Sequence, residues 1–547
     1  MNARTPQSRR APLPFAPLAA LAALAALALA LGTAACGYRP PRFADRAPVL
    51  TAGDNAPIPV PRRRRGFSAD TITDLNLRNV IVDALEPERT PEAGDVNALD
   101  EVPRSSWFDP EPAPGATPAA GEGPPELPLT ALAPSSVSRD DWPPAAASEN
   151  LITTLEGTVV AAVDALGRRY VLRRDPPDHP ALRTGTEVVA GRLVRALGYL
   201  SPRADILEIG AADLAGPPER VRAFLAAGPQ PERGRYRVSA VRWPIGVDLG
   251  PTLALATRRD DPNDRIPHRD RRTLRALGMV AGWLRWTPLD PEHLRDVYVG
   301  PPGRGHVQHH LVGLHTALGA GLIGLLPADG TTLQRVLTLG LTPEPAPIPR
   351  KQRWAGVGEI GPLVTERDID PSPSFAPIDR ALPGDHYWAA KRIRSLPAGT
   401  LAGAVAAARL PDATAAAHLL TMLEARRAQI AAFAYGRVTP CEVERIAGDT
   451  LVLRDLGVEH GLWSAMDSRY RVEQLSEEGN ELAPTRWITS ADALIDVPLP
   501  PPSGYLVLRV QVVRLAGSPA PDPGGLELHL VAGRTSGAAW RVRGVRH

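Results

Sequence analysis

The chain has 547 residues, 44% of them apolar, and its 62 Lys and Arg residues nearly balance its 60 Asp and Glu residues. This length is sufficient for two or three domains with hydrophobic cores, and a formal net charge of +2 excludes a general nucleic-acid-binding protein because no basic field covers a whole domain. With only two cysteines, Cys36 and Cys441, a disulfide-bonded scaffold and a four-cysteine zinc site are excluded as well.

The first 35 residues have the composition of a secretory signal peptide. A basic start precedes an uncharged stretch over 11–35, and the small residues 32–35 lead directly to Cys36. This order resembles a bacterial lipoprotein signal, in which Cys36 is acylated and becomes the first residue of the mature chain. The alternative is an uncleaved membrane anchor, because about 20 apolar residues are enough to cross a bilayer. The lipoprotein interpretation makes membrane lipid a partner and leaves Cys441 as a buried free thiol.

The stretch 36–150 is rich in proline, with 19 prolines among the 114 residues from Gly37 to Asn150. Such a composition buries too little apolar surface to order itself. We therefore expect a mostly disordered tether that holds the body away from the membrane. Within the tether, Thr71–Glu86 is aliphatic and free of proline, so it is the part suited to dock on the body.

A globular pattern of mixed helices and strands occupies 151–435. It opens with two strands, Gly157–Val163 and Arg169–Leu172, paired around a turn at 164–167. The elements expected next, in chain order, are a helix opening at Thr184–Glu187 and closing at Gly198, strands over Asp205–Ile209 and Tyr236–Val241, a longer helix after Pro267, a strand over Val307–Leu314 and a helix over Asp412–Phe433.

The character of the sequence changes near Gly436. Apolar or alternating runs separated by Pro and Gly predict strands, and these runs are Thr450–Leu453, Tyr505–Leu515, Leu526–Val531 and Trp540–Val545. We expect a separate, small, all-β domain over 436–547. Together with the preceding body, this predicts an α+β protein.

Short catalytic signatures are absent from the sequence: there is no G-x-S-x-G elbow, no C-x-x-C, no H-E-x-x-H and no G-x-x-x-x-G-K. Gly319, Gly321 and Gly324 match the spacing of a dinucleotide-binding loop, but Pro327 shortens the helix that such a loop requires. We interpret this segment as one of small residues that pack closely.

Four of the 12 histidines fall within ten residues: His306, His309, His310 and His315. A metal site would need two or three of them on one face. In a strand, His306 and His310 share one face while His309 and His315 share the other. His306 and His310 are therefore the candidate ligands if this cluster forms a metal site.

The order of motifs over Leu151–Ala434 resembles a known family. The motifs that carry the resemblance are YVLRRDPP at 170–177, TGTE at 184–187, RRDDPND at 258–264 with PH at 267–268, AGWL at 281–284, Asp296 and HHLV at 309–312. They resemble those of secreted bacterial lipoproteins with a kinase-like core, distantly related to the HipA-like and spore-coat-type kinases. The resemblance implies a kinase-like body.

The same resemblance implies where a kinase site would lie. Its strand cation falls at Arg173, where such proteins carry lysine, and its helix glutamate matches Glu187. A later aspartate matches Asp296, but the metal-binding aspartate falls at Gly313, and the catalytic-loop stretch reads RWTP at 285–288. Because phosphoryl transfer depends on a metal held by carboxylates, the resemblance implies a degenerate site without a cofactor.

Glu187 has two interpretations from the sequence alone. It can form an ion pair with Arg173, as a kinase-like helix glutamate does with its strand cation. It can equally complete a capping box with Thr184, because the two residues have the spacing of that motif at a helix start. The sequence leaves both possibilities open.

The sequence thus predicts a lipid-anchored bacterial outer-membrane protein with an inactive kinase-like domain that binds or scaffolds an envelope protein or ligand. One alternative is an active phosphotransferase that uses the displaced carboxylates Asp290, Glu292 and Asp296. A second alternative is a metal-dependent hydrolase that uses the histidine cluster His306–His315.

Overall fold

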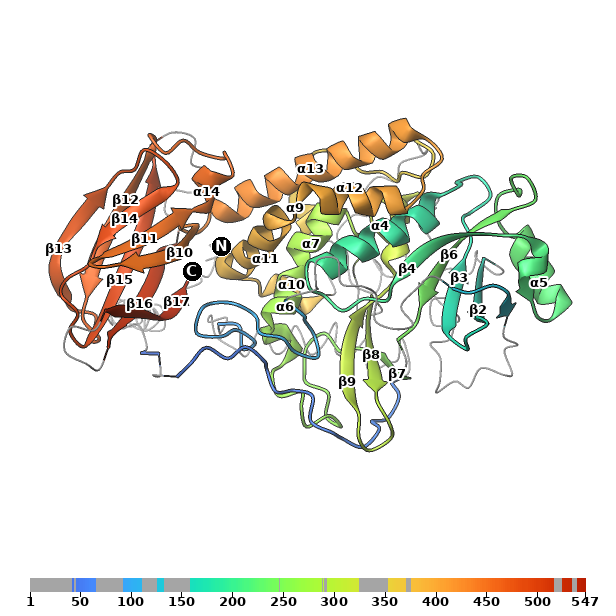
Figure 1. The fold of residues 1–547 in the computed structure, drawn as a ribbon, viewed down its shortest axis with the longest axis horizontal. Helices are drawn as coiled ribbons and strands as arrows, with labels where there is room; N and C mark the ends of the chain where they lie inside the picture. Colours follow the sequence, from blue (N-terminus) through green and yellow to red (C-terminus); the bar gives the residue numbers. More distant parts are fainter. Residues whose placement is uncertain are drawn as a thin grey trace, which may run out of the picture.

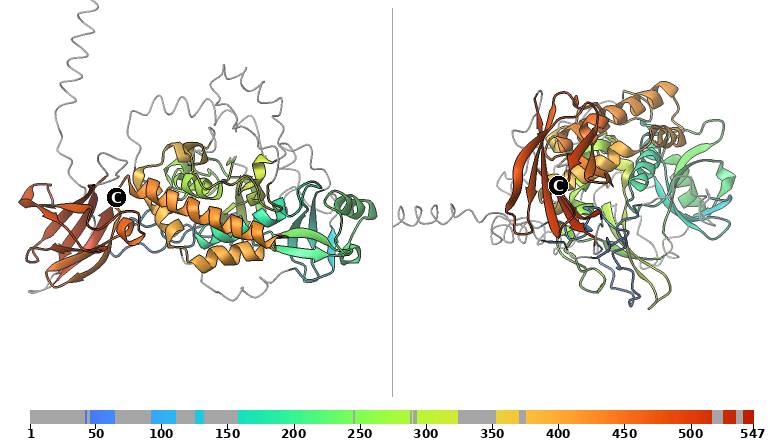
Figure 2. Two further views of the ribbon diagram at one scale, coloured as in Figure 1. Left: turned by 90° about the horizontal axis from the view of Figure 1, so that it is seen from above. Right: turned by 60° about the vertical axis from the view of Figure 1, so that its left-hand side comes forward.

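The computed structural model describes residues 42–43, 46–64, 92–110, 125–131, 158–244, 246–287, 289, 293–323, 353–369, 375–515, 524–533 and 539–547. The predictions for Cys36, Thr71–Glu86, Asp290 and Glu292 concern residues outside these ranges. The described parts form an elongated molecule with a sheet at one end, a helical layer in the middle and a second β-rich body at the other end (Figures 1 and 2).

The sheet at one end has six strands in the order β4-β6-β3-β2-β1-β5. Their bounds are β1 Leu129–Ala131, β2 Val159–Val163, β3 Arg169–Arg173, β4 Ala204–Ile209, β5 Leu214–Ala215 and β6 Tyr236–Arg242. As predicted, β2 and β3 pair antiparallel around the turn 164–167. The Asp164 carboxylate closes this turn by accepting the backbone N–H groups of Leu166 at 3.0 Å and Arg168 at 2.8 Å.

The middle of the molecule combines a three-stranded sheet, β7-β8-β9, with a layer of helices. The bounds are α4 Leu182–Ala196, α5 Pro218–Ala226, β7 Val247–Pro251, α6 Arg272–Arg275, α7 Leu277–Leu284, β8 Leu294–Val299, β9 His306–Leu311, α9 Glu366–Ile369, α10 Ala376–Asp379, α11 Pro383–Ser395, α12 Ala398–Ala407 and α13 Ala413–Tyr435. No helix among the described residues has the length and apolar character needed to cross a membrane.

Two elements of this middle part differ from the prediction. The long helix expected after Pro267 is divided at Ala276 into α6 and α7. The strand expected to reach Leu314 ends at Leu311, because Gly313 has a φ of +73° and turns the chain away from the sheet.

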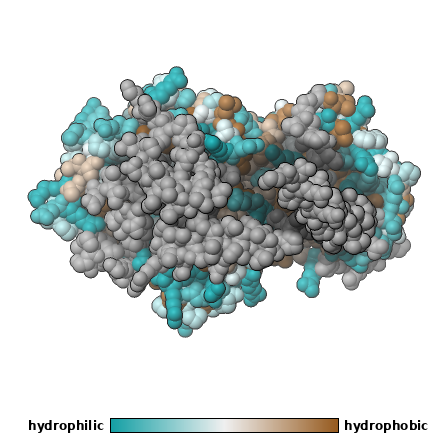
Figure 3. All heavy atoms as spheres, turned by 180° about the vertical axis from the view of Figure 1, so that it is seen from behind, coloured by the Kyte–Doolittle hydropathy of each residue, from teal (hydrophilic) through white to brown (hydrophobic). Residues whose placement is uncertain are grey.

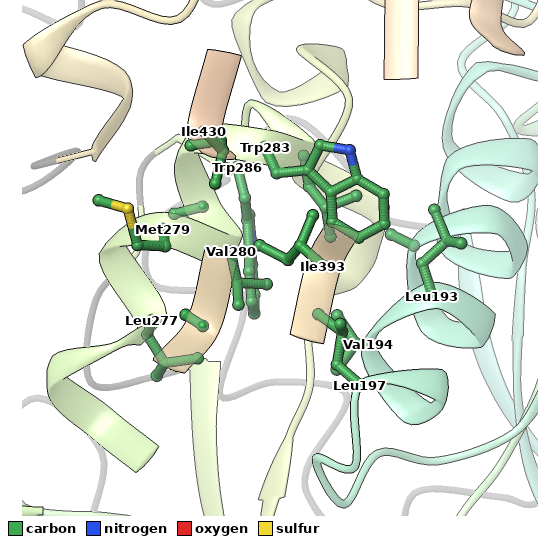
Figure 4. Close-up of a cluster of buried hydrophobic side chains, with 14 of the residues drawn as sticks. Leu193, Val194, Leu197, Leu277, Met279, Val280, Trp283, Trp286, Ile393 and Ile430 are labelled. Carbon is green, nitrogen blue, oxygen red and sulfur yellow. The ribbon is translucent and has the colours of Figure 1, made fainter. Parts of the chain in front are cut away.

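The largest hydrophobic core lies among α4, α7, α11, α12 and α13. Figure 4 shows Leu193 and Val194 of α4 facing Val280 and Trp283 of α7. Both sides of α7 are buried because the helix is apolar all round, and the Trp283 indole N–H donates to the carbonyl of Leu423 at 3.0 Å.

The proline-rich region contains three described segments, 46–64, 92–110 and 125–131, that pack on the folded parts of the molecule, and the mostly disordered tether stays a prediction for the rest of this region. Val102, Trp107 and Phe108 are buried in the main core, and the Ile58 N–H donates to the carbonyl of Gly305 at 2.9 Å. Proline favours extended chain, and extended chain can line a sheet or fill a groove whenever apolar side chains such as these supply buried area.

The C-terminal body is a sandwich of two sheets, β10-β11-β14 and β13-β12-β15-β16-β17. The bounds are β10 Cys441–Ala447, β11 Thr450–Asp455, α14 Leu456–Glu459, β12 Ser468–Leu475, β13 Glu481–Ile488, β14 Leu494–Pro498, β15 Tyr505–Arg514, β16 Leu526–Ala532 and β17 Trp540–Arg546. The four predicted strands correspond to β11, β15, β16 and β17. Cys441 is a buried free thiol in the core between the sheets.

The N-terminal segment, the helical layer and the C-terminal body meet at a cluster of charged side chains. Asp100 lies 2.6 Å from an Arg272 guanidinium nitrogen of α6 and 2.9 Å from the imidazole of His547. Nearby, Lys391 of α11 donates to Glu442 of β10 at 2.8 Å. Residues that are hundreds of positions apart in the sequence therefore hold the three parts of the molecule together.

The acid stability of the protein is expected to depend on Asp100. Burial raises the pKa of this carboxyl, but the charge of Arg272 and the hydrogen bond from His547 outweigh burial and lower the pKa from 3.8 to about 2. Asp100 therefore contributes stability that is complete above pH 4 and is lost as the pH falls towards 2, in total about 2 kcal/mol. Urea denaturation of Asp100→Asn should show a weaker loss of stability over this range, whereas the exposed Asp467→Asn should behave like the parent. If the free energy of unfolding of Asp100→Asn falls between pH 4 and pH 2 by as much as that of the parent, the assignment is wrong.

Candidate functional site

The site begins with a buried ion pair between β3 and α4. The Arg173 Nε–H donates to Glu187 Oε2 at 3.3 Å, and the Ser239 hydroxyl of β6 donates to the same oxygen at 2.7 Å. Arg173 is 9% exposed and Glu187 is 6% exposed. Of the two interpretations left open by the sequence, the structure contains the ion pair.

The capping box does not form, because α4 begins at Leu182 and Thr184 lies within its first turn. Asp175 caps this helix instead. Its Oδ1 accepts the backbone N–H groups of Arg183 at 2.8 Å and Thr184 at 2.9 Å, and its Oδ2 accepts the Thr184 hydroxyl at 2.7 Å. A carboxylate placed here satisfies helix N–H groups that otherwise have no partner.

We expect Asp175→Ala to lower the free energy of unfolding by about 1–2 kcal/mol, because the first turn of α4 loses its cap. Asp178→Ala, three residues away at an exposed position, should change stability by less than about 0.5 kcal/mol. Chemical denaturation measures both variants. Equal stabilities for the two would show that Asp175 does not hold the helix start.

Around the ion pair, the structure places cationic and neutral groups. His315 Nδ1 lies 4.0 Å from Glu187 Oε1, and burial together with the charges of Arg173 and Arg183 holds the His315 pKa well below its usual value. Burial and the charge of Arg173 likewise lower the Arg183 pKa to about 10. His315 is therefore neutral at pH 7, Arg173 is paired with Glu187, and the charge of Asp175 partly offsets the lowering of the Arg183 pKa.

Gly313 occupies the position where the resemblance places the metal-binding aspartate. A Cβ at this residue would lie 2.6 Å from His293 Cδ2, and the φ of +73° disfavours any L side chain. The imidazole of His293 also packs edge-on against Trp286, with ring centroids 5.2 Å apart. The local packing thus excludes a carboxylate at this point unless His293 moves.

Asp296 lies in a different environment from the ion pair. Its Oδ2 accepts from Arg258 at 2.7 Å, its Oδ1 lies 2.8 Å from His309 Nδ1, and the Thr252 hydroxyl donates to it as well. Burial raises the Asp296 pKa, but the charge and hydrogen bond of His309 and the charge of Arg258 lower it far more. Asp296 is therefore an ionised carboxylate whose two oxygens are both engaged within the protein.

An apolar seam joins the six-stranded sheet to the β7-β8-β9 sheet. We define this seam as Ala161 of β2, Trp243 after β6 and Val297 of β8, which are all buried, with Val171, Val299 and Val312 packed against them. Since successive strand residues point to opposite faces, Val297 faces the seam and Asp296 faces away from it. The space between the sheets is filled by side chains at this point.

The histidines of the expected cluster lie in separate environments. His309 bonds to Asp296, His315 lies beside Glu187, and His310 has a pKa lowered to about 3, mainly by burial and also by the charges of His309 and Arg195. Among the described residues, no three His, Cys, Asp or Glu side chains are grouped closely enough to hold a metal ion.

The structure brings together Arg173 and Glu187 and places Asp296 elsewhere. The family resemblance placed its catalytic-loop asparagine at His293, which the structure finds packed over Gly313. Sequence reasoning missed Asp175, Ser239 and Trp243. Nothing local marks these three, because Asp175 lies seven residues before α4 and the other two depend on which strands lie side by side.

Comparisons with known proteins add little. No protein-family model matches the chain, and no curated protein matches it. Among solved structures, the chain is similar to "A Helicobacter pylori proinflammatory kinase CtkA", with 12% sequence identity and a TM-score of 0.26 over 51% of this chain and 93% of that one. At this TM-score the likeness carries no argument about the fold or the function of this chain.

Proposed function

We propose that this chain is a non-catalytic, lipid-anchored protein of the bacterial cell envelope, whose kinase-like body binds or scaffolds another molecule. The observation that carries the non-catalytic part is the packing at Gly313. A left-handed glycine lies there beneath His293, where a metal-binding carboxylate would be required.

Two further observations support the proposal. The seam residues Ala161, Trp243 and Val297 are buried in one cluster, so side chains fill the junction of the two sheets. The carboxylate that matches a kinase position, Asp296, is fully buried and has both oxygens engaged. Arginine at 173 is also a planar, permanently charged group that replaces the compact ammonium of lysine poorly.

The test of the non-catalytic part is a thermal-shift titration of the mature chain with ATP and Mg²⁺. A ligand that binds the folded state at 100 times its Kd stabilises it by about 2.7 kcal/mol, so binding is easily detected. We expect no change in Tm. A clear rise in Tm that is abolished in the double variant Asp290→Asn, Glu292→Gln would favour the active phosphotransferase instead.

The test of the anchor is fatty-acid labelling in bacteria. We expect label on the parent protein and none on Cys36→Ser, which should leave the membrane fraction. Cys441 provides the internal control, because it is fully buried in the C-terminal core and cannot accept the lipid in the folded protein. Equal labelling of parent and variant would reject Cys36 as the attachment site.

A further inference from the structure

The five-stranded sheet of the C-terminal body has one face turned away from the core. Its inner face carries residues such as Tyr470, Leu508 and Leu528, which pack into the sandwich core. Because side chains alternate along a strand, the residues between them face outward. On this outer face, Arg471 of β12 stands between Trp487 of β13 and Gln511 of β15.

The outer face exposes large apolar side chains at one end. Trp487 is 58% exposed, Val513 is 37% exposed and Leu515, directly after β15, is 54% exposed. Met466, just before β12, is 77% exposed. The exposed Arg469 pairs with Val513 in the same row. We call Met466, Arg469, Arg471, Trp487, Val513 and Leu515 the outer patch.

The outer patch contains four exposed large hydrophobic residues, although exposed residues of this kind, such as Leu50 and Leu363, also lie elsewhere in the described chain. On the face shown in Figure 3, hydrophobic residues outside the grey regions form small areas among hydrophilic ones. Exposed apolar side chains gathered beside arginines are typical of a surface that contacts another phase or molecule. Trp in particular is favoured at the boundary between lipid and water, since its ring is apolar and its N–H is polar.

The start of the described chain docks on the same outer face. Phe43 lies over Gly544 of β17 and packs edge-on against His529 of β16, with ring centroids 4.8 Å apart. The Arg546 guanidinium lies 4.3 Å from the Phe43 ring centroid, and the Phe43 N–H donates to the Tyr505 hydroxyl at 3.0 Å. His529 of β16 pairs with Gly544 of β17 and with Val507 of β15. Because side chains alternate along a strand, Val507 and Gln511 face the same side of β15, so His529 lies on the same face of the sheet as Arg471.

The docking of Phe43 limits the distance to the lipid. Only six residue steps separate Cys36 from Arg42, and extended chain spans at most about 3.5 Å per residue, or about 20 Å in total. An acyl chain on Cys36 would therefore hold the bilayer within about 20 Å of the Phe43 end of the outer face. The expectation that a long tether separates the body from the membrane does not apply to this first stretch.

We infer that the outer face of the five-stranded sheet lies on the bilayer surface, with Trp487 and Met466 in the lipid interface and Arg469 at anionic headgroups, while Arg471 is paired with Glu473 at 2.5 Å. The inference rests on the proposed anchoring at Cys36. The outer patch adds apolar contact with the lipid interface and an exposed arginine, Arg469, that is attracted to phosphate groups.

The experiment uses the mature full-length chain with Cys36→Ser. This variant cannot be acylated at residue 36, so any membrane binding through the outer patch is measured without the lipid anchor. We expect this protein to bind vesicles of phosphatidylglycerol and phosphatidylethanolamine, more weakly at high salt, and to bind pure phosphatidylcholine vesicles much less. Adding Trp487→Ser and Met466→Ser should weaken binding at least about tenfold, because two apolar side chains no longer enter the interface. The matched control is Leu166→Ser, at the β2–β3 turn, which is also 58% exposed.

A second measurement locates the contact directly. In the Cys36→Ser background Cys441 is buried, so Met466→Cys can be labelled selectively with a polarity-sensitive dye. The dye should report an apolar environment on phosphatidylglycerol vesicles, whereas a dye at Leu166→Cys should not. Failure of the Cys36→Ser protein to bind vesicles, or undiminished binding by the patch variant, would overturn the inference. Acylation of the parent, measured separately by mass spectrometry, tests the anchor itself.

Discussion

Asp296→Ala is expected to lower the free energy of unfolding by about 3–5 kcal/mol, because it leaves the charge of Arg258 buried without its main partner. Arg258 and Asp296 are both fully buried, and they lie 2.7 Å apart. His309 also loses its acceptor. Urea denaturation monitored by tryptophan fluorescence measures the loss, since several tryptophans lie in the main core.

The matched control for this variant is Asp260→Ala. Asp260 pairs with the same Arg258 at 3.0 Å, but its side chain is 38% exposed, so its removal should cost less than about 1 kcal/mol. Equal, small losses for both variants would show that Asp296 is not needed for folding and would reopen a functional role for it. A large loss for Asp296→Ala alone supports the structural role.

Phe108→Ala should destabilise the protein by about 3–5 kcal/mol, as expected when a buried aromatic ring leaves a cavity. The ring is completely buried against Tyr199 and Trp388, with centroid distances of 5.8 and 5.2 Å. The Arg392 guanidinium lies 4.9 Å from the Phe108 centroid. Phe108 thus ties the proline-rich region to α11 and to Tyr199, which follows α4.

Leu50→Ala is the control in the same proline-rich region, because Leu50 is 76% exposed and its removal should change stability by less than about 0.5 kcal/mol. Thermal and urea unfolding should separate the two variants clearly. If Phe108→Ala unfolds like the parent, the N-terminal segment is not part of the cooperative unit, and the prediction of a tether would hold for it after all.

Elements with strong local signals were predicted well. The β2–β3 hairpin follows from two apolar runs around an Asp-Ala-Leu-Gly turn. The helix predicted over Asp412–Phe433 is α13, which begins one residue after Asp412, and the Asp412 carboxylate caps it by accepting the Thr414 N–H at 2.8 Å. The C-terminal strands were predicted from runs of apolar or alternating residues that are bounded by Pro and Gly. In each case neighbouring residues carry the information, so tertiary contacts are not needed to find the element.

The candidate site could be predicted only in part. The absence of a carboxylate at Gly313 is visible in the sequence once the order of motifs is aligned with the resembling family. The sequence does not show whether Glu187 bonds to Arg173 or caps its own helix. The answer depends on Asp175, whose carboxylate accepts the N–H groups at the start of α4 and leaves Glu187 to pair with Arg173. The packing of Trp243 against Val297 likewise depends on how the two sheets approach each other.

The amino-acid sequence by itself determined the local elements, because each of these is a property of adjacent residues, while the export signal and the loss of acids at the positions of the resembling family stay predictions. The tertiary structure decided that Phe108 and Phe43 bind the proline-rich region to the folded bodies and that Asp296 is engaged by Arg258 and His309. The reason is physical. Composition reports how much apolar area a segment carries, but only the folded chain shows whether a complementary surface is present to bury it.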